Sequence, residues 1–223
     1  FSELRPELSS VYFQFFGDRI VLVATDSFRL AEKTIAGNQF KSTVVGEFKV
    51  LLPLKTAQEL ARVLKEKGVM KIYRDQGQML FKTERIELIS RLLEGTFPDY
   101  QAVIPKEYQA EVFVDRDDFL NAVKLAGVMS GVASETALRP GNGDTLEIFS
   151  RDEKLGENSY QLAAKMKGSF NEASFNWKYL LEGAKAMPVK EFTLGLNNDN
   201  KPAILKSRQD TSYFYILMPI LKG

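Results

Sequence analysis

Few residues in this chain could carry chemistry, and they do not form a recognisable reactive set. The sequence contains no histidine and no cysteine, which removes the commonest general base, the usual partner of a nucleophilic serine and every thiolate. Asp26 is a candidate catalytic or metal-binding carboxylate, but no cluster of acidic residues accompanies it, and turn chemistry with Arg29 explains it better. The sequence therefore disfavours an enzyme, although a carboxylate-only mechanism remains open.

The glycine-rich run at 141–143 is the other feature that suggests chemistry, in this case a phosphate-binding loop. A segment with the pattern of a strand follows it rather than a helix, and the run lacks the spacing and the lysine of such loops. We therefore interpret it as a turn. No residue pattern indicates a metal or an organic cofactor, and we expect the protein to need none.

Length and composition are those of an ordinary globular protein. The 223 residues suffice for one large domain or for two of about 110 residues, and 44% are hydrophobic and 26% charged. A formal net charge of +1 does not indicate a nucleic-acid binder, although a chain with this net charge can still carry a local basic stripe on its surface. The most apolar stretch, 213–221, is far shorter than the roughly 20 residues that span a bilayer. Because the chain shows neither an initiator methionine nor a signal-like start, we expect a fragment of a cytoplasmic protein.

One order of structural elements is expected twice along the chain. In the first half, an alternating pattern around Gly17 and Asp18 predicts a hairpin, and Pro53 and Gly68 delimit a helix at 55–67. The extended segments expected in this half are 11–16, 20–25, 28–34, 48–52, 69–73, 78–82 and 85–92.

The second half repeats this order after an additional strand and helix. Asp115 is the expected N-cap of a helix that runs to about Met129, and a later helix at 177–187 ends before Pro188. Each half thus predicts antiparallel strands with helices on one face, an α+β fold. The first half lacks a counterpart of the helix after Asp115, which favours a natural chain that begins before Phe1. The extended segments expected in the second half are 111–114, 146–150, 160–166, 192–196, 203–207 and 213–218.

Three stretches go beyond this pattern. The first joins RPEL at 5–8 to VATDSFRLA at 23–31, the second is SRLLEGTFPDY at 90–100, and the third is ILMPI at 216–220. In this order and spacing they resemble the β-subunit family of bacterial DNA polymerase III, the replicative sliding clamps. The resemblance covers the whole chain and implies the second and third of three repeated domains, at 1–106 and 107–223, with the opening of the second domain missing.

The family resemblance implies a DNA clamp fold and a non-catalytic accessory subunit of a polymerase holoenzyme. Two three-domain subunits form a ring homodimer around duplex DNA, held without sequence preference, and short peptides of polymerase and clamp-loader subunits bind a shared pocket. No cofactor is implied, because the clamp loader is the member of the system that uses ATP. Two alternatives remain: a peptide-binding adaptor that no longer encircles DNA, and a carboxylate-dependent hydrolase that uses acids such as Asp26 and Asp99.

Basic residues on the polar faces of the expected helices are the candidates for contact with DNA. In the 55–67 helix, helical spacing predicts that Ala57, Leu60, Ala61 and Leu64 are buried, which leaves the basic side chains outside. Without the resemblance these are solvated helix faces, whereas with it they suit the diffuse phosphate attraction that a sliding ring needs. The DNA-facing candidates are Lys55, Arg62, Lys65, Lys124, Lys178 and Lys185.

The resemblance also implies a peptide-binding pocket made from both halves. Taken by themselves, the aliphatic candidates suit a core, the segment 25–27 suits a turn, and Pro98 suits a rigid linker. Together they offer aliphatic walls, a rigid proline and a few polar groups, as a peptide cleft needs. Ala102 occupies a place that is often basic in relatives, and the tail continues through 221–223, so we expect a different rim. The pocket candidates are Leu8, Thr25, Ser27, Arg29, Leu30, Pro98, Val103, Asn176, Tyr179, Ile216, Leu217, Met218, Pro219 and Ile220.

Overall fold

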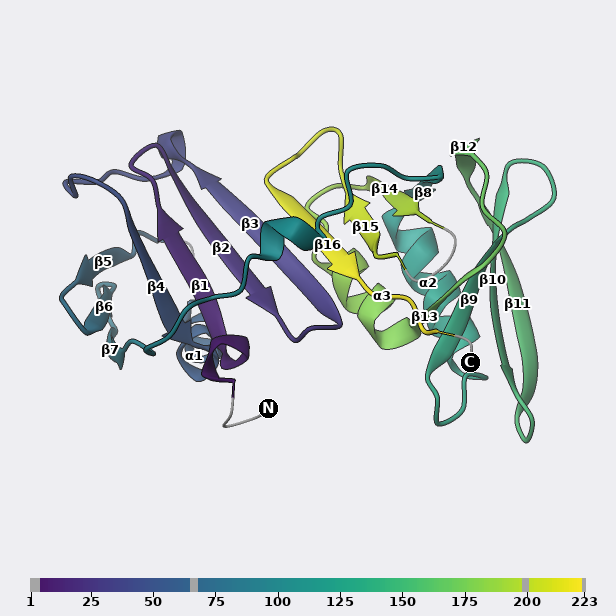
Figure 1. Cartoon of the computed structure of the whole chain (residues 1–223), viewed down its shortest axis with the longest axis horizontal. Coiled ribbons are helices and arrows are strands. Elements are labelled where there is room, and N and C mark those ends of the chain that lie inside the picture. Colours follow the sequence, from purple (N-terminus) through teal and green to yellow (C-terminus); the bar gives the residue numbers. More distant parts are fainter. Residues whose placement is uncertain (1–4, 65–67, 198–200, 222–223) are drawn as a thin grey trace. The chain divides into compact units, whose positions relative to one another are not determined.

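The chain forms two compact units, which Figure 1 traces from purple at the N-terminus to yellow at the C-terminus. The computed structural model describes residues 5–64, 68–197 and 201–221. The first unit comprises Phe1–Ser27 and Glu32–Tyr100, and the second comprises Phe28–Ala31 and Gln101–Gly223. The short segment 28–31 therefore belongs with the second unit, although it lies early in the sequence.

The first unit combines four adjacent strands, in the order β3-β2-β1-β4, with a helix and a three-stranded meander, β5-β6-β7. Gly17, at φ +79°, provides the backbone conformation that the β1–β2 turn requires. The elements are η1 Pro6–Ser9, β1 Ser10–Phe15, β2 Arg19–Thr25, β3 Arg29–Ala36, η2 Gly37–Gln39, β4 Phe48–Pro53, α1 Leu54–Val63, β5 Lys71–Arg74, β6 Gln78–Lys82 and β7 Glu87–Arg91.

Apolar side chains from β1, β4, α1 and β6 form the core of the first unit. Phe13 faces Val50 across the β1–β4 pair, and its ring stacks on that of Phe48 with centroids 5.9 Å apart. Leu60 of α1 and Met79 of β6 are buried in the same core. The helix is thus held by its apolar face, as its spacing predicts.

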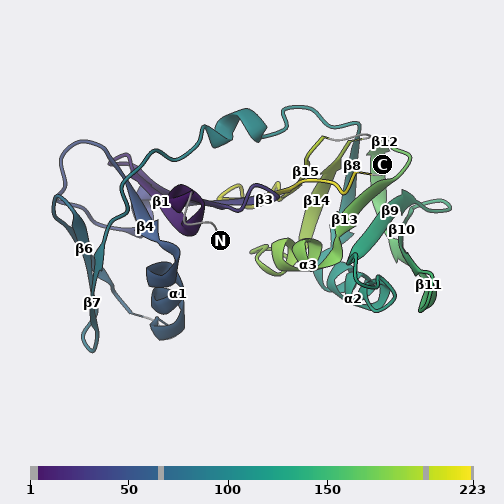
Figure 2. The same ribbon diagram turned by 60° about the horizontal axis from the view of Figure 1, so that its bottom comes forward.

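The second unit has two antiparallel sheets, ordered β12-β8-β14-β15-β16 and β11-β10-β9-β13. Its two α-helices pack against each other, and Figure 2 shows them side by side on one side of the strands. The elements are η3 Tyr100–Val103, β8 Ala110–Asp115, α2 Arg116–Gly127, β9 Glu135–Pro140, β10 Thr145–Asp152, β11 Gly156–Ala163, β12 Lys165–Gly168, β13 Ala173–Asn176, α3 Trp177–Lys185, β14 Glu191–Leu196, β15 Ala203–Lys206 and β16 Tyr213–Leu217.

Side-chain caps start both helices of the second unit. The Asp115 carboxylate accepts hydrogen bonds from the backbone N–H groups of Asp117 at 2.9 Å and Asp118 at 3.2 Å. The side-chain carbonyl of Asn176 accepts from the N–H of Lys178 at 3.0 Å. These bonds satisfy amides that have no partner within their helix. The predicted N-cap at Asp115 is confirmed.

A glycine allows the two helices to approach closely. α2 ends at Gly127, where an added Cβ would lie 2.5 Å from the indole of Trp177, the first residue of α3. Any larger residue at this position would force the Trp177 ring or the helices to move. No helix in the described ranges is long and apolar enough to cross a bilayer.

The two units repeat one order of elements, as expected from the sequence. The strand order β3-β2-β1-β4 corresponds to β11-β10-β9-β13, and the meander β5-β6-β7 corresponds to β14-β15-β16. In each unit an α-helix, α1 or α3, lies between these two groups in the sequence. The second unit also contains α2 and β8, which pairs with β14. The first unit, as far as the structure describes it, has no equivalent of β8 and α2.

Several expected elements differ from the structure. Residues 160–166 form parts of two strands rather than one, because β11 pairs with β10 whereas β12 pairs with β8. Neither β9 nor β13 was expected as a strand. Ala61 is exposed rather than buried, because it lies at the border of the apolar face of α1. Within the described residues α1 ends at Val63, and the expected continuation over 65–67 lies outside them.

Candidate functional site

The C-terminal segment of the second unit is held between two backbone hydrogen bonds. The N–H of Met218 donates to the carbonyl oxygen of Phe28 at 2.8 Å, and the N–H of Ile220 donates to that of Ser174 at 2.7 Å. The segment that follows β16 therefore lies between the start of β3 and strand β13. This arrangement brings together residues that are far apart in the sequence.

Arg29 connects this segment to helix α3. Its guanidinium carbon lies 4.2 Å from the centroid of the Tyr179 ring, and the guanidinium forms an ion pair with Glu182. Tyr179 and Glu182 are neighbours on one face of α3 because they are three residues apart. The Arg29 side chain is 26% exposed and that of Glu182 is 58% exposed, so the ion pair lies at the surface.

Tyr215 is buried near Arg29, and its ring packs against α3. An added Cβ on Gly183 would lie 2.4 Å from its ring. Burial raises the pKa of Tyr215, and the nearby Arg29 guanidinium opposes the rise. The hydroxyl is buried without a well-aligned hydrogen-bond partner among the residues described. It is therefore a neutral phenol at physiological pH.

An apolar surface is accessible beside the Arg29 contact. Phe28 is 62% exposed and Met218 is 38% exposed, whereas Leu30, Ile216 and Leu217 are buried. We call the group formed by Phe28, Arg29, Tyr179, Glu182, Met218, Pro219 and Ile220 the tail surface. It combines exposed apolar side chains with one cation that a carboxylate neutralises. Such a surface can bind a short peptide, but it contains no group placed for covalent or acid–base chemistry.

The structure brings some of the pocket candidates together in the second unit. Arg29 contacts Tyr179, the Asn176 cap positions the first turn of α3, and the residues from Ile216 to Ile220 form the end of β16 and the bonded tail. Leu30, Ile216 and Leu217 are core residues rather than surface residues. Val103 belongs to the same unit, in η3, and is 48% exposed.

The remaining pocket candidates belong to the first unit. Leu8 is half-buried in η1, and Pro98 is half-buried between the buried Phe97 and Tyr100. Thr25 ends β2, and its hydroxyl accepts a 3.2 Å hydrogen bond from the N–H of Ser27, which has a φ of +75°. The turn expected at 25–27 is confirmed. Participation of these residues in one pocket with the tail surface stays a prediction.

Sequence reasoning did not include three residues of this region, Phe28, Glu182 and Tyr215. Phe28 lies within the family-like run at 23–31, where an aromatic side chain between polar neighbours was a usable signal. Glu182 follows Tyr179 by one helical turn, and this spacing was also visible in the sequence. Nothing in the sequence pattern indicates that Tyr215 lies next to Arg29.

The DNA-facing candidates that the structure describes are exposed side chains on helices. Lys55 and Arg62 lie on α1, Lys124 lies on α2, and Lys178 and Lys185 lie on α3. Lys65 lies outside the described residues. Arg62 is paired with Glu59 at 2.9 Å, and its hydrogen bond lowers the pKa of that carboxyl group. Part of the charge on α1 is therefore neutralised locally, and contact of these residues with DNA stays a prediction.

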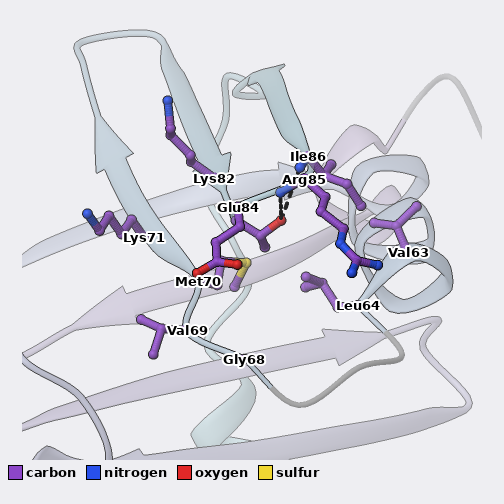
Figure 3. A pocket seen from close by; sticks show the side chains of 11 residues that line it. Val63, Leu64, Gly68, Val69, Met70, Lys71, Lys82, Glu84, Arg85 and Ile86 are labelled. Carbon is purple, nitrogen blue, oxygen red and sulfur yellow. Dashed lines mark hydrogen bonds between the residues drawn. The ribbon is translucent and has the colours of Figure 1, made fainter.

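A hollow of about 520 Å³ lies in the first unit, between the end of α1 and the strands β5 and β6 (Figure 3). Val63, Leu64, Met70 and Ile86 supply apolar surface. Lys71, Lys82, Glu84 and Arg85 line it as well, and the Thr83 hydroxyl oxygen accepts from the N–H of Ile86 at 3.1 Å. The corresponding side of α3 and β14 in the second unit is covered by α2 and β8. The described residues that line the hollow form no arrangement of groups typical of catalysis.

The acidic residues that the structure describes do not gather in either unit as a metal site would require. Within residues 5–64, 68–197 and 201–221, no three aspartate or glutamate side chains come together as potential metal ligands. Asp26 therefore has no such cluster around it. This arrangement gives no support to the carboxylate-dependent hydrolase considered above.

Comparison with known proteins identifies the family. Residues 1–99 match the family model for the central domain of the DNA polymerase III beta subunit, and residues 101–221 match the model for its C-terminal domain. The chain belongs to the DNA polymerase III β-subunit family. The family resemblance read from the sequence is therefore confirmed.

Individual members of the β-subunit family give the same result. The beta sliding clamp of Synechococcus elongatus is 30% identical over 224 residues, and the match covers 98% of this chain and 59% of that protein. The beta sliding clamp of Staphylococcus aureus is 30% identical over 223 residues, with 98% and 58% covered. The chain thus spans less than two thirds of the length of these relatives.

Solved structures of β subunits share the fold. The DNA polymerase sliding clamp of Bacillus subtilis superposes with a TM-score of 0.91 at 25% identity, and the match covers 100% of this chain and 59% of that one. A Pseudomonas aeruginosa clamp bound to griselimycin gives a TM-score of 0.89 at 24% identity and supports the fold alone. The expected α+β clamp fold is confirmed.

Proposed function

We propose that this chain is part of a DNA polymerase processivity factor, a sliding clamp that encircles duplex DNA and tethers polymerase. The observation that carries the proposal is the match of both halves, in order, to the central and C-terminal domains of one protein, the DNA polymerase III beta subunit. The proposed role is binding, so the protein acts as an accessory subunit without its own catalysis or cofactor. It would act in the bacterial cytoplasm, where replication takes place.

The tail surface supports the tethering part of this proposal. The exposed Phe28 and Met218 offer apolar contact area, and Arg29 of this surface and Asn176 at the start of α3 offer polar groups that can orient a peptide. Buried residues beneath them, including Leu30 and Leu217, fix the position of the exposed ones. Polymerase and clamp-loader subunits would bind here through short, partly hydrophobic motifs.

The helix pair of the second unit supports the DNA-binding part. Lys124 on α2 and Lys178 and Lys185 on α3 are exposed on two helices that pack side by side. Phosphate attraction from such side chains is independent of sequence and weak at each contact, which permits sliding. In the full-length protein we propose a ring homodimer as the form that retains DNA.

Retention on circular DNA tests the proposed function. A longer polypeptide that contains this chain would be loaded on a nicked circular duplex, and the amount retained would be followed after gel filtration. We expect stable retention on the circle and rapid loss after the DNA is cut once with a restriction enzyme, because a ring slides off free ends.

Other outcomes of this retention experiment would contradict the proposed sliding clamp. Equal and rapid loss from circular and linear DNA would contradict encirclement. If the same polypeptide still bound a polymerase-derived peptide, the result would favour the peptide-binding adaptor over the clamp. Retention that persists on linear DNA would indicate tight direct binding rather than sliding.

A further inference from the structure

The ion pair between Arg29 and Glu182 is not needed to hold its two segments in place. The segment 28–31 is fixed by the buried Leu30 and by the hydrogen bond from Met218 to Phe28. Helix α3 is fixed by Leu180 and Ala184, which are completely buried. The ion pair therefore adds little to the stability of the fold. Because it lies on the tail surface, it can instead influence what binds there.

Glu182 controls what the Arg29 guanidinium can bind. One face of the guanidinium lies over the Tyr179 ring, and its Nη1 atom contacts the Glu182 carboxylate. A guanidinium binds carboxylates strongly through its edge, so Glu182 takes up hydrogen-bonding capacity that a ligand carboxylate would use. A ligand with an acidic side chain at this point competes with Glu182 for the guanidinium and also approaches a like charge.

The neighbouring charges do not remove this effect. On α3, Lys178 lies one turn before Glu182 and Lys185 lies one turn after it, and both lysine side chains are exposed. Water and salt screen their attraction for an anion, whereas direct contact at Arg29 is less screened. Beside Arg29, the exposed Phe28 and Met218 offer only apolar surface.

We propose that Glu182 is a specificity-determining residue of the tail surface. By occupying Arg29, it favours partner segments that present an uncharged side chain there and disfavours those that present a carboxylate. This inference rests on the proposed peptide-binding function. It goes further by naming the residue that sets the charge preference.

A peptide scan against two variants tests the inference. Acetylated and amidated Gln-Leu-Ala-Leu-Phe would be changed at each position in turn to Glu or to Gln, and the dissociation constants would be measured by fluorescence anisotropy in 50 mM NaCl. We expect the unaltered protein to bind the Gln peptide better than the Glu peptide at the position that reaches Arg29. In Glu182→Gln, the relative affinity for the Glu peptide should rise about two- to fivefold at that position alone.

The matched control is Glu153→Gln, which removes the same charge from the turn between β10 and β11. At every peptide position, Glu153→Gln should leave the ratio of the dissociation constants of the Glu and Gln peptides unchanged. In 500 mM NaCl, this ratio should differ less between Glu182→Gln and the unaltered protein than it does in 50 mM NaCl. If a bound peptide shows the same ratios in Glu182→Gln and in the unaltered protein, the specificity role of Glu182 is wrong while the peptide site stands. If no peptide of the set binds the unaltered protein, the proposed peptide-binding function fails and this inference fails with it.

Discussion

The backbone N–H of Met218 donates a 2.8 Å hydrogen bond to the carbonyl oxygen of Phe28. This bond places the two exposed apolar residues of the tail surface next to each other, although 190 positions separate them in the sequence. It also ties the segment 28–31 to the second unit. The tail surface therefore depends on the fold of the second unit. The stability of that unit can be tested separately from peptide binding at the tail surface.

Gly183→Ala should destabilise the second unit. The new methyl group would lie 2.4 Å from the Tyr215 ring, which is buried and cannot move away without disturbing β16. We expect a loss of about 1–3 kcal/mol in the free energy of unfolding, measured by urea denaturation. Gly77→Ala is the control, because no atom lies within 4 Å of an added Cβ there, and it should change stability by less than about 0.5 kcal/mol. Equal effects of the two substitutions would contradict the close packing of Tyr215 on α3.

Asp115→Ala should remove the N-cap of α2 and cost about 1 kcal/mol of stability at pH 7. The N–H groups of Asp118 and Asp117 hold the pKa of Asp115 below its ordinary value of 3.8 in the folded state. Because the folded pKa lies below the unfolded one, this stabilisation is present above pH 3.8 and is lost as the pH falls through the folded pKa.

Urea titrations of the Asp115→Ala variant and the unaltered protein at several pH values check this sign. The difference in unfolding free energy should stay constant from pH 7 to pH 5 and shrink below pH 3.8. A difference that grows as the pH falls would show that Asp115 does not act as a charged cap.

The basic residues of the helix pair should determine the salt dependence of DNA binding. In a longer polypeptide that contains this chain, the combined change of Lys124, Lys178 and Lys185 to Gln should weaken DNA binding. The slope of log K against log salt concentration should become shallower by about 0.9 for each phosphate that a lysine no longer neutralises.

The control for this charge series changes Lys154, Lys165 and Lys167 to Gln, which removes the same charge from the β10–β11 turn and from β12. The salt slope of this control should equal that of the unaltered protein. A slope that falls equally in both variants would indicate general charge attraction rather than contact through α2 and α3.

The local features of the fold were predictable because they rest on short-range rules. Asp115 before an amphipathic segment, Pro188 after one and Gly17 in a hairpin turn each leave a signal within a few residues. The division of residues 160–166 between β11 and β12 was not predictable, because strand partners are chosen by distant residues and the side-chain alternation does not change at Ala164.

The candidate site was predictable only in part for the same reason. The family-like run at 216–220 and Tyr179 could be assigned by resemblance, position by position. The resemblance did not separate buried from exposed positions, so Leu30 and Ile216 were grouped with Met218 although they lie in the core. The contacts of Arg29 with Glu182 and Tyr179 join segments that lie far apart in the chain, and no local pattern encodes such a pairing.

Burial determines which substitution tests the peptide site without unfolding the protein. Leu30 is 4% exposed, so Leu30→Asp would place a charge in the core and would confuse folding with binding. Met218 is 38% exposed, so Met218→Asp changes the surface while leaving the core intact. Leu155→Asp is the matched control, because Leu155 is 55% exposed in the turn between β10 and β11.

Peptide binding at the tail surface is best measured by an anisotropy titration of a labelled Gln-Leu-x-Leu-Phe peptide with the unaltered chain, Met218→Asp and Leu155→Asp. We expect saturable binding to the unaltered chain and to Leu155→Asp with equal affinity. In Met218→Asp, the affinity should fall at least about tenfold, as expected for a central contact of a binding surface. Equal affinity in all three proteins would contradict the assignment of the tail surface as the peptide-binding site.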